Sequence, residues 1–251
     1  MQFNVLIRER FVDRIEIRDT IDFYIMELHM KLSNQTLAIL KNFSTINKGI
    51  QFKAGSKLAT ISSGKSVLAN AVLTDEFPTD FCVYDLTQFL SVYSLFKESV
   101  ELEFDGINVI FNSGRSKIKY RVTEPEMILL PPEKEIVLPS VDCSFTLTAA
   151  DYDWIMKTCS VLSSPHIGIK SDGEKIEIIT FDANNDSAHT NFIQVADASG
   201  ESYTVVFKVE NVKMIPGSYD VNISFKGIGH FKNTTEEVQY WIAFESKESK
   251  V

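Results

Sequence analysis

Six lysines and no acidic residue lie between Glu27 and Asp75. The whole chain carries a formal charge of -9, so the sign of the charge is reversed in this segment. Lysine is a flexible, hydrated point charge that suits contacts with phosphate groups. Because salt confines the reach of a charge to about 8–10 Å, an acidic protein can still present a basic face to a polyanion. The six residues are Lys31, Lys41, Lys48, Lys53, Lys57 and Lys65.

The other reactive side chains form no recognisable catalytic pattern. Ser62–Ser66 ends like a phosphate-binding loop, but Ala59 stands where that motif needs glycine, and the following residues predict a strand instead of a helix. Asp151 and Asp153 fall in the first turn of a predicted helix, where the helix dipole accounts for them. No ligand spacing connects the four histidines, His29, His166, His189 and His230. The sequence therefore predicts a protein that is not an enzyme and needs neither metal nor cofactor.

Composition sets further bounds on the class of protein. With 251 residues and 44% hydrophobic content, the chain can form one large domain or two small ones with a real core. The three cysteines, Cys82, Cys143 and Cys159, lack metal-ligand spacing and are expected to be reduced, packed thiols. No run approaches the roughly 18 apolar residues of a membrane span, and the N-terminus does not resemble a secretory signal. We expect no membrane partner.

The first predicted helix, Asn34–Ile46, has one apolar and one polar face. Leu37, Leu40 and Phe43 recur at helical spacing, and Ser33 or Asn34 can cap its open N–H groups. The opposite face is small, polar and basic. It consists of Asn34, Ala38, Lys41, Thr45 and Lys48.

An internal repeat indicates a duplicated α+β domain. Ile50–Leu58 matches Ile167–Ile176, and Val100–Ile107 matches Val221–Ile228, in the same order and at similar offsets. The alternative is that both matches are generic hairpins. The expected domains are residues 30–123 and 143–251, joined by a connector, residues 124–142, in which four prolines prevent regular structure. Further predicted elements are helices Leu86–Phe96, Ala149–Ser163 and Val209–Met214 and strand Ala188–Val195.

Residues 1–29 differ in composition from the remainder, since they hold four arginines and no lysine. They are either an extension that packs on the fold or sequence upstream of a natural start at Met30. We expect the second.

Several motifs resemble the sliding clamps of T-even-type bacteriophages, which are DNA polymerase processivity factors. They are Met30–Ser33 followed by Leu40–Ile50, Tyr84–Leu86 with Phe89-Leu90, and Val212–Tyr219. The resemblance runs from Met30 to near the C-terminus. It implies a closed ring of three identical subunits with sheets outside and helices inside. It also implies sequence-independent binding of duplex DNA, tethering of the phage DNA polymerase, loading by an ATP-dependent clamp loader, and a place in the cytoplasm of the infected host. Late transcription factors are partners of relatives.

The resemblance also implies three sets of functional residues. Lysines on or beside the helices line the hole: Lys41, Lys48, Lys97, Lys157 and Lys213. Strands Lys117–Val122 and 186–195 meet between subunits through Lys117, Ile118, Lys119, Tyr120, Arg121, His189, Asn191 and Ile193. A pocket for partner peptides near the connector involves Met127, Ile128, Leu129 and Leu130.

Each assignment has a plainer alternative. The lysines can be ordinary solvated residues, and the four apolar residues can simply pin the connector onto the domains. A duplicated β-rich structural protein of a virus, assembling through the same edges, is the alternative for the function. The second domain's helix carries Lys157 together with Asp153, so we expect the first domain to supply more of the positive field.

Overall fold

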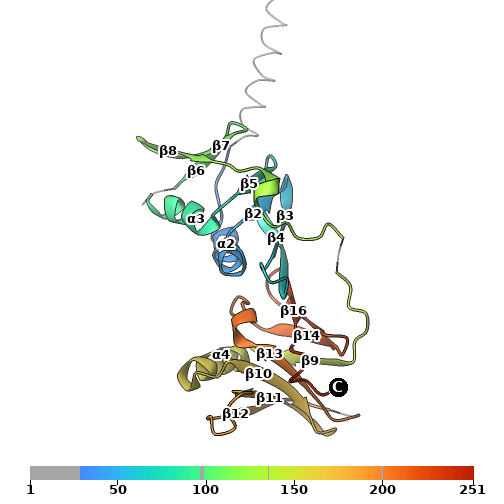
Figure 1. The fold of residues 1–251 in the computed structure, drawn as a ribbon. Coiled ribbons are helices and arrows are strands. Elements are labelled where there is room, and N and C mark those ends of the chain that lie inside the picture. Colours follow the sequence, from blue (N-terminus) through green and yellow to red (C-terminus); the bar gives the residue numbers. More distant parts are fainter. Residues whose placement is uncertain (1–28, 97–98, 135, 199) are drawn as a thin grey trace, which may run out of the picture.

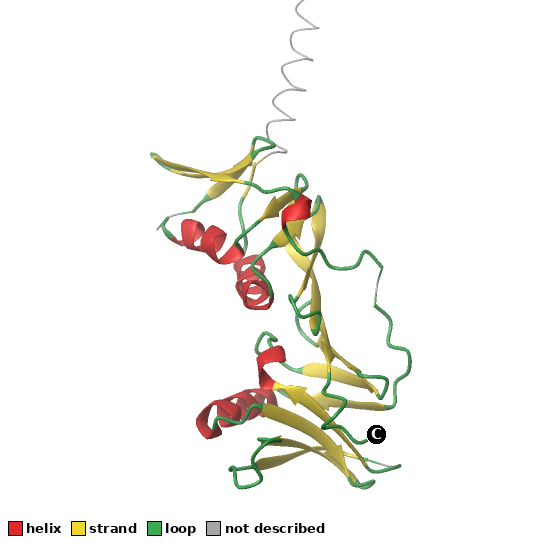
Figure 2. Ribbon diagram, viewed as in Figure 1, coloured by secondary structure: helices red, strands yellow, loops and turns green. Residues whose placement is uncertain are grey.

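The computed structural model describes residues 29–96, 99–134, 136–198 and 200–251. The predictions for residues 1–28 and for Lys97 lie outside this part of the chain. The described residues form three sheets and three α-helices, α2 (Asn34–Ile46), α3 (Leu86–Ser94) and α4 (Ala149–Leu162). All three helices lie on one side of the sheets, and the connector runs along the opposite side (Figures 1 and 2). We call the side that carries the helices the inner side.

The first half of the chain contributes two groups of four strands. One group is a separate sheet in the order β1-β6-β7-β8, and the other forms one half of an eight-stranded sheet in the order β5-β2-β3-β4. The bounds are β1 (His29–Met30), β2 (Ile50–Phe52), β3 (Gly55–Ile61), β4 (Val67–Phe77), β5 (Phe81–Val83), β6 (Glu101–Phe104), β7 (Asn108–Ser113) and β8 (Ser116–Arg121).

The second half repeats this plan element by element. Its separate sheet has the order β12-β11-β10-β13, and β16-β15-β14-β9 complete the eight-stranded sheet. In chain order, β1 to β8 therefore correspond to β9 to β16. The separate sheet of the first half corresponds to the β16-β15-β14-β9 half of the shared sheet, and the β5-β2-β3-β4 half corresponds to the separate sheet of the second half. The bounds are β9 (Cys143–Leu147), β10 (His166–Ser171), β11 (Lys175–Phe181), β12 (Asn191–Asp197), β13 (Tyr203–Lys208), β14 (Tyr219–Ser224), β15 (Ile228–Asn233) and β16 (Val238–Ala243).

Glycines with positive φ lie in the corresponding turns of the two halves. Gly55 is the first residue of β3, and Gly173 lies in the turn just before β11; their φ values are 102° and 96°. Gly106 and Gly227 occupy the other matched turn with φ of 87° and 111°. A residue with a Cβ is strained in this left-handed region, so both copies retain glycine there.

The two halves join through strands β4 and β16. They pair antiparallel over five residue pairs, from Val238 opposite Ala71 to Ile242 opposite Val67. This pairing makes the eight-stranded sheet continuous through the molecule (Figure 1).

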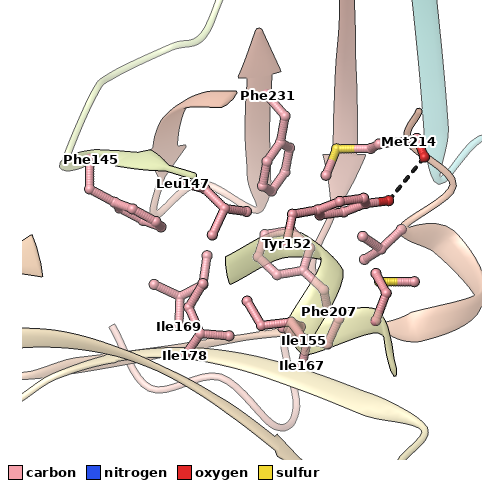
Figure 3. Close-up of a pocket in the computed structure, with 12 residues that line it drawn as sticks. Phe145, Leu147, Tyr152, Ile155, Ile167, Ile169, Ile178, Phe207, Met214 and Phe231 are labelled. Carbon is pink, nitrogen blue, oxygen red and sulfur yellow. Dashed lines mark hydrogen bonds between the residues drawn. The ribbon is translucent and has the colours of Figure 1, made fainter. Parts of the chain in front are cut away.

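Each half has its own apolar core. Phe52 in the first half stacks on Phe81 with ring centroids 4.4 Å apart, and Phe89 meets Phe111 edge-on at 4.9 Å. The second half packs α4 against both of its sheets around Tyr152 and Ile155, and a small, wholly apolar cavity of about 30 Å³ remains there (Figure 3).

Three predicted elements have bounds that differ by two or more residues in the structure. The predicted helix Val209–Met214 is one 3₁₀ turn, η2 (Val209–Asn211), because Val212 and Met214 turn into the core. The strand predicted at Ala188–Val195 begins only at Asn191. Before it, Asp182 and Asn185 accept backbone hydrogen bonds that fold the chain into turns. Helix α3 ends at Ser94 instead of Phe96.

Candidate nucleic-acid interface and subunit edges

Helix α2 presents a basic face that carries no acidic side chain. Ser33 caps the helix by accepting a hydrogen bond from the N–H of Thr36 at 3.1 Å. Because Ile39, Leu40 and Phe43 are buried, the opposite face turns to solvent on the inner side. All of its members are exposed, as predicted: Asn34, Ala38, Lys41, Thr45 and Lys48. Contact of Lys41 and Lys48 with DNA stays a prediction.

Helix α4 occupies the equivalent place but has no net charge on this face. Its buried residues Ile155 and Cys159 align with Ile39 and Phe43, which makes Lys157 the counterpart of Lys41. The ammonium group of Lys157 lies 2.5 Å from the Asp153 carboxylate, one turn away. Since the pair cancels, α2 supplies more positive charge than α4 among the described helices.

Lys213 lies at the junction of the two halves, and its side chain has a structural contact. Its Nζ donates a hydrogen bond to the carbonyl oxygen of Thr45 at the C-terminal end of α2, at 2.6 Å. The backbone oxygen of Lys213 accepts from Asn42 Nδ2 at 3.1 Å. The Oδ1 atom of Asn42 in turn accepts from the Tyr240 hydroxyl at 2.9 Å. No pattern in the sequence indicates this linkage between α2 and the second half.

The strands predicted to meet between subunits are both at sheet edges. Strand β8 pairs only with β7, and β12 pairs only with β11, within the part of the chain that the structure describes. Two other edges are bridged within the chain: Thr123 bridges to Cys82 in β5, and Lys250 pairs with Thr204 in β13. The remaining end strands among the described residues are β1 and β9, which pair with β6 and β14. His189 was predicted to belong to this edge strand, but it precedes β12 (Asn191–Asp197) and is therefore not part of the observed strand.

Side chains on the two edge strands alternate. Ile118 and Tyr120 are half-buried, and the Tyr120 hydroxyl donates to the Asp85 carbonyl oxygen at 3.1 Å. Lys117, Lys119 and Arg121 on the other face are exposed. On β12, Ile193 is half-buried and Phe192 is 59% exposed. The Nδ2 atom of Asn191 is buried without a hydrogen-bond partner among the described residues.

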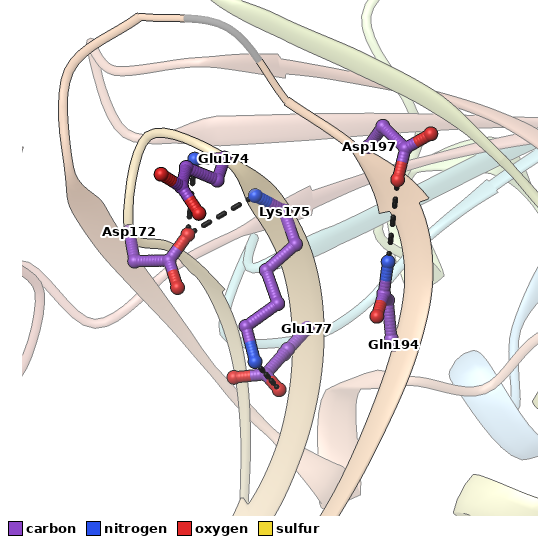
Figure 4. A network of polar contacts seen from close by, with 6 residues as sticks. All are labelled: Asp172, Glu174, Lys175, Glu177, Gln194 and Asp197. Atoms are coloured by element: carbon purple, nitrogen blue, oxygen red, sulfur yellow. Dashed lines mark hydrogen bonds and ion pairs between the residues drawn. The ribbon is translucent and has the colours of Figure 1, made fainter.

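Acidic groups gather at the sheet that ends in β12 (Figure 4). Glu177 on β11 lies opposite Gln194, and Gln194 Nε2 donates to Asp197 at 3.3 Å. Hydrogen bonds from the N–H groups of Glu174 and Lys175 lower the pKa of Asp172, which keeps this carboxylate ionised. Lys175 pairs with Glu177 at 2.8 Å, which leaves Asp172, Glu174 and Asp197 as an excess of acidic groups near β12. Strand β8 carries three basic side chains, of which Lys117 pairs with Glu103 at 3.3 Å.

The connector touches the first half through a glycine. A Cβ on Gly49 would lie 2.7 Å from Ile128 Cγ2, so only glycine allows this approach. Ile128 follows the 3₁₀ turn η1 (Pro125–Met127). Met127, Leu129 and Leu130 are exposed. Of the four predicted pocket residues, Ile128 thus anchors the connector, and the other three remain accessible.

The cysteines are free and buried. Burial raises the pKa of Cys159 to about 11, so this thiol stays protonated and unreactive near neutral pH. Within the described ranges, no group of three or more His, Cys, Asp or Glu side chains could hold a metal ion. None of the helices in the described part of the chain is long and apolar enough to cross a membrane.

The architecture is that of the sliding clamps. Proliferating cellular nuclear antigen from Entamoeba histolytica superposes with a TM-score of 0.64 at 14% identity, covering 86% of this chain and 98% of that one. The antigen from Thermococcus kodakaraensis gives 0.63 at 14% identity, with 86% and 99% covered. A Helicobacter pylori beta clamp bound to a DNA ligase peptide gives 0.63 at 13% identity, with 86% and 65% covered.

Sequence comparison narrows the class to one family. The family model described as DNA polymerase processivity factor matches residues 31–130. The sliding clamp of Enterobacteria phage T4 is 31% identical over 223 residues, 86% of this chain and 97% of the relative. That of Vibrio phage KVP40 is 30% identical, covering 86% and 100%. The chain belongs to the phage sliding clamps, the DNA polymerase processivity factors. This finding favours the clamp interpretation over that of a structural protein of a virus.

Proposed function

We propose that the protein closes into a head-to-tail homotrimer that encircles duplex DNA and tethers the phage DNA polymerase, without catalysing a reaction itself. One observation carries the ring. The open edge strands β8 and β12 are the counterparts of β16 and β4, which already pair inside the chain. Pairing β8 of one copy with β12 of the next repeats that junction and removes two exposed edges.

The repeat also supplies a register for this contact. Followed from the helix caps and from the matched strands β2 and β10, the pairings make Phe192 the counterpart of Asn70 and Lys117 the counterpart of Gln239. Since Asn70 lies opposite Gln239, Phe192 should lie opposite Lys117 of the partner subunit. This register also places exposed residues of both strands on one face, and the basic side chains of β8 meet the acidic groups near β12.

Cysteine cross-linking tests the register. Lys117→Cys combined with Phe192→Cys should give disulfide-linked trimers under mild oxidation, because directly opposed Cβ atoms lie about 4.5–5.5 Å apart. The matched control, Lys117→Cys with Gln194→Cys, displaces one thiol by two residues on the same face and should cross-link much less. The native cysteines are buried and should not interfere. Equal cross-linking in both variants would refute the register, and a monomer in solution would refute the ring.

The inner side then faces DNA. A trimer carries three copies of the α2 face, each with exposed Lys41 and Lys48. Lysine contacts with phosphate position a duplex without reading its sequence, as sliding requires. The formal charge of -9 disfavours DNA elsewhere on the molecule. No cofactor takes part.

The proposal includes two further kinds of partner. Exposed Met127, Leu129 and Leu130 beside the Gly49 contact are candidates to receive an apolar peptide of the polymerase, which gains from the high effective concentration of a tethered ligand. An ATP-dependent clamp loader opens and closes the ring, in the cytoplasm of the infected bacterium. Late transcription factors are proposed as additional users of the same pocket.

Primer extension tests the function. With polymerase, loader and this protein, extension products from a single binding event should lengthen. Lys41→Glu with Lys48→Glu should shorten them while the trimer persists, whereas Lys53→Glu, an exposed lysine outside the α2 face, should not. If the unaltered protein fails to lengthen products, the proposed function is wrong.

A further inference from the structure

An exposed tryptophan stands out on helix α4. Trp154 has 55% of its surface exposed, and it has no aromatic stacking partner within the described ranges. The second tryptophan, Trp241, is only 4% exposed and stacks on His230 with ring centroids 4.8 Å apart. An exposed indole on a helix therefore needs a separate explanation.

The repeat shows which surface Trp154 belongs to. The alignment of Ile155 with Ile39 makes Trp154 the counterpart of Ala38, in the middle of the exposed face of α2. Lys157, three residues further along α4, is the counterpart of Lys41. Both helices lie on the inner side (Figure 1), so the surface that faces DNA in the proposed ring includes Trp154.

We infer that Trp154 contacts the sugar–phosphate backbone of the encircled duplex and gives the second half of the chain an uncharged contact with DNA. This inference rests on the proposed function and deepens it. Lys157 adds little attraction for DNA, because the Asp153 carboxylate 2.5 Å away leaves this face of α4 without net charge. The indole can lie against deoxyribose, and its Nε1–H can donate to a phosphate oxygen. Sugar and phosphate recur at every nucleotide, so the contact carries no sequence preference.

The chemistry predicts a distinctive salt dependence. Neutralising a phosphate with lysine releases counterions, which makes affinity fall with salt. An indole neutralises no phosphate. Trp154→Ala should therefore weaken duplex binding about equally at all salt concentrations, several-fold, and leave the slope of log affinity against log salt unchanged. Trp154→Phe should retain part of the apolar contact and lose the Nε1–H donor.

Fluorine NMR tests the contact directly. The trimer is labelled with 5-fluorotryptophan, and the Trp154 resonance is assigned by its loss in Trp154→Phe. A short duplex is then added at low salt, and its binding is followed independently by the anisotropy of a dye on the DNA. The Trp154 resonance should shift and lose sensitivity to exchange of H₂O for D₂O, while the buried Trp241 resonance stays in place.

The outcomes separate the inference from the proposed function. Anisotropy that reports binding, weakened by Lys41→Glu, together with an unmoved Trp154 resonance would overturn the inference alone. A Trp154 resonance that responds to a polymerase peptide and not to duplex would overturn it too. Absence of any duplex binding would overturn both proposals.

Discussion

Lys41 and Lys157 form a natural pair for measuring how the proposed ring would hold DNA. They occupy equivalent helix positions, yet Lys41 has no acidic neighbour on its face and Lys157 is 2.5 Å from Asp153. Replacing each lysine with alanine compares the loss of a lysine without an acidic neighbour on its face with the loss of an ion-paired lysine in the same protein. We expect Lys41→Ala to reduce the salt dependence of duplex binding and Lys157→Ala to leave it nearly unchanged.

The size of the effect follows from counterion release. Each phosphate neutralised on B-DNA contributes about -0.9 to the slope of log affinity against log salt. If all three copies of Lys41 contact phosphate, Lys41→Ala lowers the slope by about 2.7. Between about 50 and 200 mM salt, this difference amounts to roughly 40-fold in affinity. Asp153→Ala should act in the opposite direction, because it frees Lys157 and should steepen the slope.

The assay is fluorescence anisotropy of a labelled duplex at a series of NaCl concentrations, with the trimer confirmed by light scattering. Equal slopes for Lys41→Ala and the unaltered protein would refute the assignment of Lys41 to the hole. A loss of slope in Lys157→Ala as large as in Lys41→Ala would refute the argument that Asp153 cancels Lys157.

Three other predictions concern stability and partner binding. Asn42→Ala leaves the buried Tyr240 hydroxyl without its acceptor, and we expect the free energy of unfolding in urea to fall by about 1–3 kcal/mol. Gly49→Ala places a Cβ against Ile128; the connector must shift, and a polymerase peptide should bind more weakly by calorimetry while the trimer persists. Burial raises the pKa of Tyr152 to about 12. The protonated hydroxyl is therefore favoured in the fold, and up to about 2.7 kcal/mol of stability, fully present below pH 10, should be lost as pH rises to 12.

Each of these has a contrary result. A stability unchanged by Asn42→Ala would mean that Tyr240 finds another acceptor. Tight peptide binding by Gly49→Ala would place the pocket away from Ile128. Tyr152→Phe is the control for the alkaline loss. It removes one titrating group and should make the loss less steep, while Tyr203, Tyr219 and Tyr240, whose pKa values burial also raises, still titrate. An equally steep loss between pH 10 and 12 in that variant would assign the effect to other tyrosines.

Most of the fold could be predicted because local patterns and tertiary packing agree. The stripe Leu37, Leu40, Phe43 specified α2 closely, and Thr148 with Asp151 marked the start of α4. The helix predicted at Val209–Met214 was wrong. Its apolar residues have helical spacing, but the chain forms a single 3₁₀ turn there, and Val212 and Met214 are buried after it. Tertiary packing overrides a pattern this short.

The site was less predictable because it depends on contacts between distant residues. The sequence identifies Lys41 and Lys48 as members of an exposed face, and that exposure is confirmed. It cannot show that Lys213 donates to Thr45, more than 160 residues away in the chain, or that Ile128 rests on Gly49. Trp154 was missed because helical spacing alone does not distinguish an exposed indole from a buried one.

Retention on closed DNA tests the central claim most directly. The protein is loaded onto nicked circular DNA with its loader and ATP, free protein is removed, and the DNA is cut once with a restriction enzyme. A ring that encircles the duplex should stay with the circle at a salt concentration that abolishes direct binding, and it should slide off within minutes after linearisation. Retention that survives linearisation, or loss from the intact circle under the same conditions, would contradict the account.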